Sequence, residues 1–494
     1  MFNLPEGYQP RQAPTEFADA PGVWTYQPYV YESAFMLAKR CGARRIVDIG
    51  CGSGAKLLPF EKDFELVCID APIGLQFARK TLSKAQFIEH DLETGLPSLP
   101  ESMLRNAVVV CSDVVEHIRR PDKLLRDLAQ AASCAPYVLL STPDRDRARG
   151  WLDDGPPANP SHVFEWSGPE LLRFMKASGF GDLEFYGHTV NTNFHLAKAT
   201  TLVVSGRETR RPGAAPANFR VAAVLHTFNE NDMIAETVEH LVSQGVEVHV
   251  FDNWSTDGSF STLEHLRDQG LVKHLEKFPK APTSEYCWRE QLLKTAEYAR
   301  TLDVSWVMHH DADELRVSPW AGCSVRDAVW AIDSLGYNAI DFTVIDFRFL
   351  SVSEDPARPY RETMNFFQFG RRPGHFSQVK LWKNTQQIEL ASSGGHSADF
   401  SGRRIFPLKF LLRHYPLRTR NQAATKVFRD RLPRVQTEKA QRGWHTQYDH
   451  FEGRPEIPGW NRHELIPWHP VQFMNEYLTE RLFGVGIRDE EALY

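Results

Sequence analysis

Blocks of apolar residues recur along the chain at the spacing of an α/β protein. Short apolar runs that end in glycine or an acid predict buried strands, and stretches with apolar positions three and four apart predict helices. In the first half we expect strands at 45–49, 65–70, 87–92, 107–111 and 137–140, and the last strands of that half within 193–205. Helices are expected at 29–40, directly after Gly54, and from Gly168 to about Ser178.

The same periodicity restarts after an interruption. Residues 206–218 have no periodicity and contain proline and glycine, which is typical of a linker. Beyond it we expect strands at 221–225, 246–251 and 304–308 and helices at 232–243 and 288–298. The pattern predicts an α/β protein with two domains: a leader at 1–27, a first domain at 28–205, the linker at 206–218, a second domain at 219–430 and an aromatic-rich extension at 431–494.

Composition narrows the class of protein. The 494 residues are 42% hydrophobic and 24% charged, as in ordinary globular proteins. The formal net charge of −6 gives no reason to expect a nucleic-acid partner. Seven scattered cysteines without a CxxC pair fit a reducing compartment, and neither a signal peptide nor a membrane helix is expected. The sequence therefore predicts a cytoplasmic protein.

A glycine-rich turn follows the first strand. Asp48-Ile49-Gly50-Cys51-Gly52-Ser53-Gly54 lets backbone amides approach a ligand closely. Gly50, Gly52 and Ala55 also satisfy the G-x-G-x-x-G/A fingerprint of NAD sites, so an NAD-dependent oxidoreductase is an alternative. Two features argue against NAD: an acid inside the strand end, and a third glycine only two residues after the second.

Further acids follow the next strands in order. Asp70 ends the second strand about twenty residues beyond Asp48, the spacing at which an acid meets ribose hydroxyls. Asp91 follows the third strand, and Asp113-Val114-Val115-Glu116-His117-Ile118 follows the fourth. Together with the glycine turn, these pieces resemble the class I S-adenosylmethionine-dependent methyltransferases. The resemblance implies a Rossmann-like domain with a seven-stranded mixed sheet that binds S-adenosylmethionine through Asp48, Gly50, Cys51, Gly52, Gly54, Asp70, Asp91, Leu92 and Asp113.

Two histidines are candidates for proton removal in that domain. Methyl transfer by in-line displacement depends mainly on positioning, and a base is needed only when the acceptor is a hydroxyl. His117 serves as a base or as a packed structural residue. His162 and Glu165 belong to a Pro- and Gly-rich loop at 151–166, where substrate contacts are common.

A second cluster of acids follows the apolar run at 304–308. Asp311 and Asp313 are two apart, so in extended chain both carboxylates point the same way and suit Mg²⁺ or Mn²⁺. An acidic surface loop is the alternative. Upstream, an apolar strand ends at Asn229-Glu230 and another ends at Asp252-Asn253-Trp254-Ser255-Thr256-Asp257-Gly258. In this order the three pieces resemble the family 2-like glycosyltransferases of the GT-A fold.

This second resemblance implies a nucleotide-sugar donor and a metal ion. The donor residues would be Thr227, Asn229, Glu230, Asp252, Arg289 and Asp311, and the Mn²⁺ or Mg²⁺ ligands would be Asp311, Asp313 and His414. Glu314 and Asp346 are candidates for the catalytic base, with Asp341 as a further one. Three alternatives stay open: Arg289 in a surface ion pair, His414 as a core histidine, and Asp257 as a turn residue that caps a helix.

Basic residues gather between 403 and 434. They form either a solvated basic face or an electropositive wall for diphosphates and anionic lipid headgroups. Peripheral contact with the inner face of a membrane is a hypothesis from this region. Together, the patterns predict a bifunctional enzyme that methylates and glycosylates a glycan or lipid-linked saccharide acceptor. A non-catalytic nucleotide-binding scaffold is the alternative.

Overall fold

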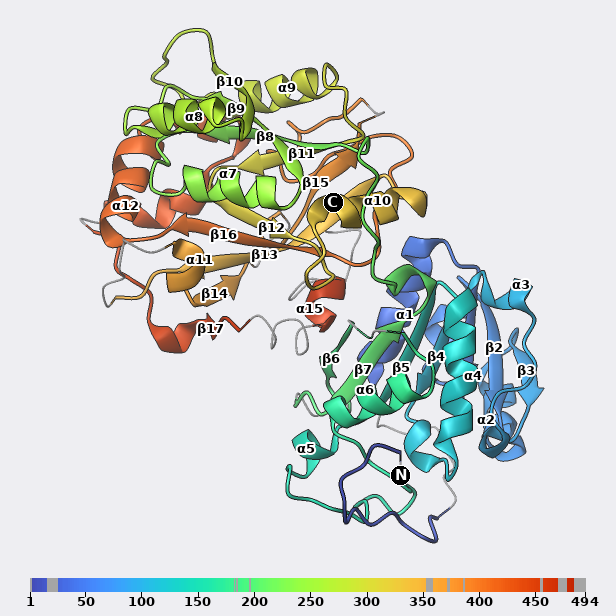
Figure 1. Cartoon of the computed structure of the whole chain (residues 1–494). Helices are drawn as coiled ribbons and strands as arrows, with labels where there is room; N and C mark the ends of the chain where they lie inside the picture. The colour runs from blue at the N-terminus through green and yellow to red at the C-terminus, as the bar shows by residue number, and fades with distance from the viewer. Residues whose placement is uncertain are drawn as a thin grey trace. The chain divides into compact units, whose positions relative to one another are not determined.

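The computed structural model divides the chain into two compact units. Its description covers residues 2–15, 25–181, 183, 185–194, 197–351, 359–370, 374–384, 387–453, 456–469 and 478–483. One unit comprises Met1–Arg211 with Pro470–Phe483, and the other Pro212–His469 with Gly484–Tyr494 (Figure 1). The division after Arg211 falls within the linker predicted at 206–218.

The first unit is built on a seven-stranded mixed sheet, as predicted. The strand order is β3-β2-β1-β4-β5-β7-β6, with β7 antiparallel to both β5 and β6. The strands are β1 (Arg45–Ile49), β2 (Glu65–Asp70), β3 (Gln86–Glu89), β4 (Ala107–Ser112), β5 (Tyr137–Pro143), β6 (Tyr186–Thr189) and β7 (Thr200–Ser205). β1 pairs in parallel with both β2 and β4, so the order of the strands runs outward from β1 on both sides. Open α/β sheets bind ligands at such a reversal of the strand order.

Helices cover this sheet (Figure 1). They are α1 (Pro28–Cys41), α2 (Pro72–Thr81), α3 (Glu101–Leu104), α4 (Pro121–Cys134), α5 (Arg145–Ala148), α6 (Gly168–Ala177) and α15 (Leu478–Phe483). β4 is buried along its whole length, which explains its uninterrupted apolar sequence. Helix α6 begins with a capping box formed by Ser167 and Glu170.

Two local predictions for the first unit were wrong. The helix expected after Gly54 is replaced by successive turns and the short 3-10 helix η1 (Leu58–Phe60). Gly52 and Gly54 lie in the left-handed region, and Pro59 removes a helical hydrogen-bond donor, so an α-helix cannot form there. The stretch 193–205 contributes only β7, because β6 lies earlier in the chain.

Both ends of the chain contribute to the first unit. Residues 2–15 contain no helix or strand, yet they bond to the loop at 151–166 through Gln9 N to Asp154 O (2.7 Å) and Arg11 N to Val163 O (3.0 Å). Near the other end, residues 478–483 form α15, and residues 470–477 lie outside the described part. Leu478 and Leu482 of α15 are buried, and Lys198 pairs with Glu480.

The second unit has a larger mixed sheet with the order β10-β9-β8-β11-β15-β13-β14-β17, and β12 pairs with β16 beside it. β10, β9, β8 and β11 are mutually parallel, and β15 is antiparallel to β11. The strands are β8 (Val221–Thr227), β9 (Val246–Asp252), β10 (Val272–Lys277), β11 (Trp306–Asp311), β12 (Glu314–Val317), β13 (Ala339–Arg348), β14 (Phe366–Phe369), β15 (Ser377–Lys383), β16 (Phe410–Leu417) and β17 (Ile466–Pro467).

The helices of this unit are α7 (Ile234–Ser243), α8 (Ser259–Asp268), α9 (Trp288–Ala299), α10 (Val325–Ser334), α11 (Tyr360–Thr363), α12 (Arg420–Ala424) and α13 (Gln436–Arg442). Val224, Phe251, Val307 and Trp382 belong to one buried cluster of the core. The strands predicted near 221, 246 and 304 are all present, and β11 extends to Asp311.

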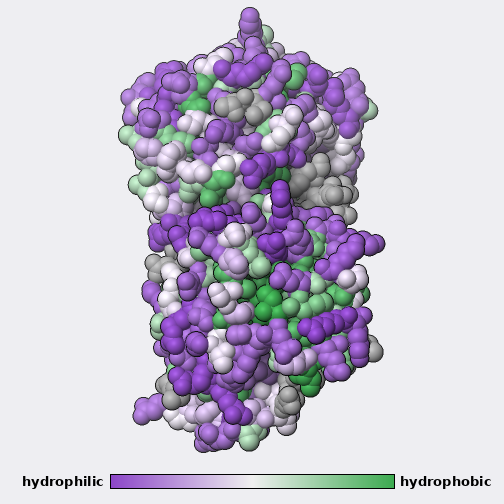
Figure 2. Space-filling view, turned by 90° about the vertical axis from the view of Figure 1, so that its right-hand side faces the viewer, coloured by the Kyte–Doolittle hydropathy of each residue, from purple (hydrophilic) through white to green (hydrophobic). Residues whose placement is uncertain are grey.

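Hydrophilic side chains dominate the face drawn in Figure 2, and hydrophobic ones form smaller groups among them. In the part of the chain that the structure describes, no helix combines the length and the apolar character needed to span a bilayer.

Candidate active sites

The glycine turn of the first unit is shaped by left-handed backbone. Gly50, Gly52 and Gly54 have φ values of 74°, 52° and 70°. A Cβ on Gly50 would lie 2.3 Å from Cγ2 of Val114, which follows β4. Only glycine fits there without displacing Val114, so the turn after β1 packs directly on the segment after β4.

Asp70 ties this turn to the end of β2. Its Oδ2 accepts a hydrogen bond from Gly52 N, and its Oδ1 accepts one from Ala71 N, both at 2.7 Å. Asp48, by contrast, is buried within the unit, and its carboxylate accepts a hydrogen bond from the Tyr31 hydroxyl at 3.1 Å. Asp70 thus lies where a ribose contact was predicted, whereas Asp48 supports the strand end from inside the unit.

The other predicted cofactor residues lie on neighbouring strand ends. Asp91 is exposed and caps the 3-10 helix η2 (Leu92–Thr94) by accepting from Glu93 N at 3.0 Å. Leu92 and Cys51 are buried. Asp113 has a φ of 62° and accepts from Gln27 Nε2 at 2.7 Å.

Gln27 was not predicted as part of the site. It is fully buried directly before α1, and its Oε1 accepts from Ser112 Oγ at 3.2 Å. No sequence motif marks a lone glutamine at this position, so only the fold reveals the contact.

His117 and His162 meet beside Glu116, as a cluster that the sequence predicted in part. Val163 N donates to Glu116 O at 2.7 Å, which holds the loop at 151–166 against the segment after β4. The two imidazole rings are 4.8 Å apart. Burial and the neighbouring His162 lower the pKa of His117, so its imidazole is neutral near pH 7 and able to accept a proton.

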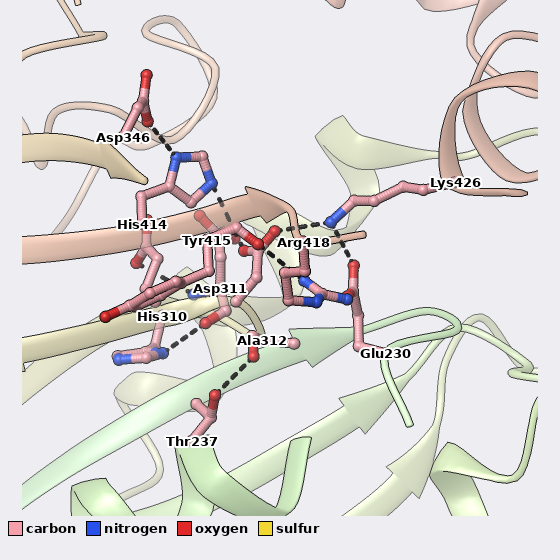
Figure 3. Close-up of polar contacts among 12 residues, drawn as sticks. Glu230, Thr237, His310, Asp311, Ala312, Asp346, His414, Tyr415, Arg418 and Lys426 are labelled. Atoms are coloured by element: carbon pink, nitrogen blue, oxygen red, sulfur yellow. Dashed lines mark hydrogen bonds and ion pairs between the residues drawn. The ribbon is translucent and has the colours of Figure 1, made fainter. Parts of the chain in front are cut away.

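In the second unit, predicted site residues line a cavity of about 470 Å³. The lining includes Glu230, Asp311, Asp313, Asp346, His414 and Lys426. These residues come from the end of β11, the turns after β8 and β11, the strands β13 and β16, and η5 (Thr425–Arg431), so long-range folding assembles the site. Figure 3 shows the Lys426 ammonium bonded to Glu230 and the His414 ring bonded to Asp346.

Asp311 and Asp313 both face this cavity, and each holds a lysine. Lys380 Nζ lies 2.5 Å from Asp311 Oδ2, and Lys426 Nζ lies 2.7 Å from Asp313 Oδ2. Burial favours the neutral acids, but the lysines reverse this effect and hold the pKa of both carboxyls well below the usual range. The oxygen donors suit a divalent cation, which would have to displace an ammonium from each carboxylate.

His414 lies between two carboxylates of the cavity, and its role as a metal ligand stays a prediction. Its Nδ1 lies 2.7 Å from Asp346 Oδ1, and its Nε2 lies 3.7 Å from Asp313 Oδ1. Burial opposes protonation, yet Asp313 and Asp346 raise the pKa of His414 to about 10. In this arrangement the two acids favour the protonated ring.

The two predicted bases are also engaged. Glu314 is buried and pairs with Arg316 and, at 3.1 Å, with Lys380, because a buried arginine needs a counterion. Asp346 binds His414 and, at 3.1 Å, Arg348. Asp341 is fully buried and pairs with Lys409. None of the three carboxylates is free to take a proton in this arrangement.

The turns after β8 and β9 are bonded to each other. Asn229 N donates to Ser255 Oγ at 3.0 Å, and Thr256 N donates to Asn229 Oδ1 at 2.8 Å. Thr227 and Asp252 are register partners at the two strand ends, and both are buried. Burial raises the pKa of Asp252.

Two further predictions for this unit are settled by position. Asp257 accepts from Ser259 N at 3.0 Å and from Asn231 N at 2.9 Å, which agrees with the turn interpretation. Arg289 is exposed and is not one of the residues that line the cavity, and its diphosphate contact stays a prediction. Arg431 lines the cavity instead, with its guanidinium over the Tyr286 ring.

The basic region at 403–434 is not a uniform solvated face. Four of its basic residues are buried: Lys409, Arg418, Lys426 and Arg431. Arg418 Nη2 lies 2.5 Å from Glu230 Oε2 and 2.7 Å from Asp232 Oδ1. These buried cations neutralise acids inside the unit and cannot meet a membrane surface.

The order of the seven strands fits a Rossmann-like α/β domain, with the glycine turn and the predicted acids at the ends of β1, β2 and β4. A family model described as a methyltransferase domain matches residues 24–184. Residues 24–184 therefore form an S-adenosylmethionine-dependent methyltransferase domain. This finding favours the methyltransferase prediction over the NAD-dependent oxidoreductase.

Relatives of known class agree with this assignment. A probable S-adenosylmethionine-dependent methyltransferase of Mycolicibacterium smegmatis is 28% identical over 147 residues, which are 29% of this chain and 54% of the relative. A ubiquinone biosynthesis O-methyltransferase of Proteus mirabilis is 26% identical over 120 residues, 22% of this chain and 45% of the relative. The chain spans about half the length of the curated relatives it matches.

Solved structures of methyltransferases were also matched. An S-adenosylmethionine-dependent methyltransferase from Aquifex aeolicus has a TM-score of 0.27 and 19% identity, over 36% of this chain and 89% of that one. One from Mesorhizobium loti has a TM-score of 0.26 and 20% identity, over 34% of this chain and 93% of that one.

Proposed function

We propose that the first unit transfers a methyl group from S-adenosylmethionine to a hydroxyl group, with a saccharide as the acceptor. The observation that carries the proposal is the neutral His117 beside His162, next to the segment that packs on the glycine turn. A hydroxyl needs a base when its oxygen becomes the nucleophile. The name of the Proteus mirabilis relative, an O-methyltransferase, is in line with transfer to an oxygen atom.

The proposed reaction replaces a carbon–sulfur bond with a carbon–oxygen bond. A histidine of the pair accepts the proton of the acceptor hydroxyl while the oxygen attacks the methyl carbon. The carbon–sulfur bond breaks, and its electron pair stays on sulfur. The products are a methyl ether and S-adenosylhomocysteine, and the proton then leaves the imidazolium to water.

Calorimetric titration with S-adenosylmethionine tests the cofactor. Asp70→Ala removes the carboxylate that holds Gly52 and Ala71, so we expect at least tenfold weaker binding. Asp63→Ala, an exposed aspartate of the same unit, is the matched control and should bind like the unmodified chain. Unchanged affinity in Asp70→Ala would reject the ribose contact, and no heat with the unmodified chain would reject the activity.

We propose as a second activity that the second unit transfers a sugar from a nucleotide-sugar donor. The support is the cavity of about 470 Å³ at the ends of parallel strands, a volume suited to a small ligand. Lys380, Lys426 and Arg431 line it and offer positive charge to a diphosphate leaving group. The buried Thr227–Asp252 pair at neighbouring strand ends is our proposed nucleoside site.

A divalent cation on Asp311 and Asp313 remains part of this proposal. Bound Mn²⁺ or Mg²⁺ supplies Lewis-acid neutralisation of diphosphate charge. The chain's own residues prepare the site: Lys380 and Lys426 keep both carboxylates ionised, and protonated His414 adds a further positive charge at the cavity. A glycan or lipid-linked saccharide remains the proposed acceptor of both activities.

Titration with UDP in the presence of Mn²⁺ tests the second activity. Asp313→Asn keeps the side-chain shape but removes the charge, so we expect at least tenfold weaker UDP binding, with S-adenosylmethionine binding unchanged. The control is Asp303→Asn, a fully exposed aspartate of the same unit. Equal loss of both ligands in Asp313→Asn would contradict two separate sites.

A further inference from the structure

Glu116 is a buried acid with unused oxygens. Its side chain is fully buried, and neither carboxylate oxygen has a hydrogen-bond partner in the described part of the chain. A carboxylate without a partner is costly in such surroundings. The group therefore calls for either a bound proton or a cation.

Two histidines lie where they can share a cation with Glu116. One ligand atom from each of Glu116, His117 and His162 lies within 4.8 Å of the others. All three side chains come from the segment after β4 and from the loop that Val163 N and Glu116 O hold against it. Small side-chain rotations bring such atoms to the separations found around one ion.

The hydrogen bonds of both rings fix the tautomer that a metal needs. His117 Nδ1 lies 3.0 Å from Ser161 O, and His162 Nδ1 lies 2.6 Å from Glu165 Oε1. A carbonyl and a carboxylate only accept, so both Nδ1 atoms donate and the lone pairs lie on the Nε2 atoms. Metal-binding histidines show this pattern, in which the other ring nitrogen donates to a carbonyl or carboxylate.

We propose that Glu116, His117 and His162 bind a divalent first-row transition-metal ion. Two imidazoles and one carboxylate suit such an ion and leave coordination positions open. His162 Nε2 lies 2.9 Å from Asn159 Nδ2, a contact that the ion replaces. Glu165 acts as a positioning residue, held by Arg149 at 2.8 Å while it orients His162.

The position of the proposed ion would allow it to bind the hydroxyl group of the methyl acceptor. Val114, two residues before Glu116, packs on Gly50 of the glycine turn, so the cluster belongs to the segment that packs on the predicted cofactor site. With the ion bound, both histidines act as ligands and no longer as the base, and an acceptor hydroxyl on the ion would have a lowered pKa and lose its proton to water. This role rests on the proposed methyl transfer, whereas binding of the ion does not.

Metal binding is measured on the full-length chain with Asp311→Asn and Asp313→Asn, which removes the predicted metal ligands of the second unit. After dialysis against Mn²⁺ or Zn²⁺, we expect about one ion per chain, and the spectrum of bound Mn²⁺ should report nitrogen ligands. Adding Glu116→Gln or His162→Asn should weaken binding at least tenfold. His188→Asn, which alters a buried histidine that pairs with Asp144 at 2.8 Å outside the cluster, should bind normally.

The outcomes separate this inference from the proposed function. Failure of both ions to bind, or unchanged binding in Glu116→Gln and His162→Asn, would overturn the metal site and show that Glu116 instead carries a proton. The circular dichroism spectrum and the melting temperature of each variant verify that it is folded, and His162→Asn on the loop serves if Glu116→Gln does not fold. Metal binding without any S-adenosylmethionine binding would overturn the methyl transfer alone.

Discussion

Individual lysine side chains set the charge inside the cavity of the second unit. Lys426 Nζ lies 2.6 Å from Glu230 Oε1 and 2.7 Å from Asp313 Oδ2, so one ammonium joins two strand ends. The sequence predicted the acids, because a pair two apart after an apolar run is visible in any reading. It could not predict their partners, because Lys426 is 113 residues from Asp313 and only folding brings them together.

Gly50 is the residue for which sequence and structure agree most directly. Gly50→Ala would place a methyl group 2.3 Å from Val114 Cγ2 and force a side chain into the left-handed region. We expect a loss of about 2–4 kcal/mol in the free energy of unfolding and weaker S-adenosylmethionine binding. Denaturant titration and calorimetry measure the two effects.

Gly213→Ala is the matched control for that change. A Cβ on Gly213 meets nothing within 4 Å. Its effect on unfolding should stay within about 0.5 kcal/mol. If Gly50→Ala proved as harmless as Gly213→Ala, the close packing of the turn on Val114 would be wrong.

At the scale of elements, the apolar runs predicted the central strands well. Buried parallel strands such as β4 and β8 are apolar over most of their length, so composition alone marks them. The turns after Gly54 were missed because a glycine loop followed by a helix is the commoner arrangement. The pairing of β12 with β16 was missed because strand partners distant in sequence leave no local signal.

Neighbouring strands β8 and β9 carry buried neutral histidines, which makes stability depend on pH. Burial lowers the pKa of His226 and of His249 to about 4. In the unfolded chain the pKa of each histidine is about 6.5, so between about pH 6.5 and 4 the unfolded state binds protons that the folded state does not bind. Stability should therefore be highest above about pH 6.5 and fall as the pH drops toward 4, by up to about 3 kcal/mol for each histidine.

Denaturant unfolding between pH 4 and 8 tests this dependence. His249→Leu removes one titrating group and the contact of Nδ1 with the Tyr298 hydroxyl at 3.1 Å. The variant should lose some stability at pH 7 but show a shallower decline below pH 6.5. The same decline in both proteins would mean that His249 is not held neutral by the fold.

At the scale of the whole molecule, the linker predicted two units and the structure divides the chain within it. The chain's return to the first unit was not predicted. Helix α15 contacts β6 and α1, which precede it by hundreds of residues. The hydrophobic periodicity of a short amphipathic segment does not identify the surface on which it packs, so the sequence cannot show which unit the helix joins.

This return makes the first unit depend on residues near the far end of the chain. Leu478 and Leu482 are 2% and 1% exposed, so the double change Leu478→Ala with Leu482→Ala should remove about 3–6 kcal/mol of stability from the first unit. Differential scanning calorimetry can assign the transitions, because S-adenosylmethionine should raise the melting temperature of one unit and UDP that of the other. Only the transition raised by S-adenosylmethionine should fall.

Leu293→Ala, at a leucine 44% exposed in the second unit, should shift neither transition. A fall in the UDP-sensitive transition instead would place α15 with the second unit and refute the division of the chain.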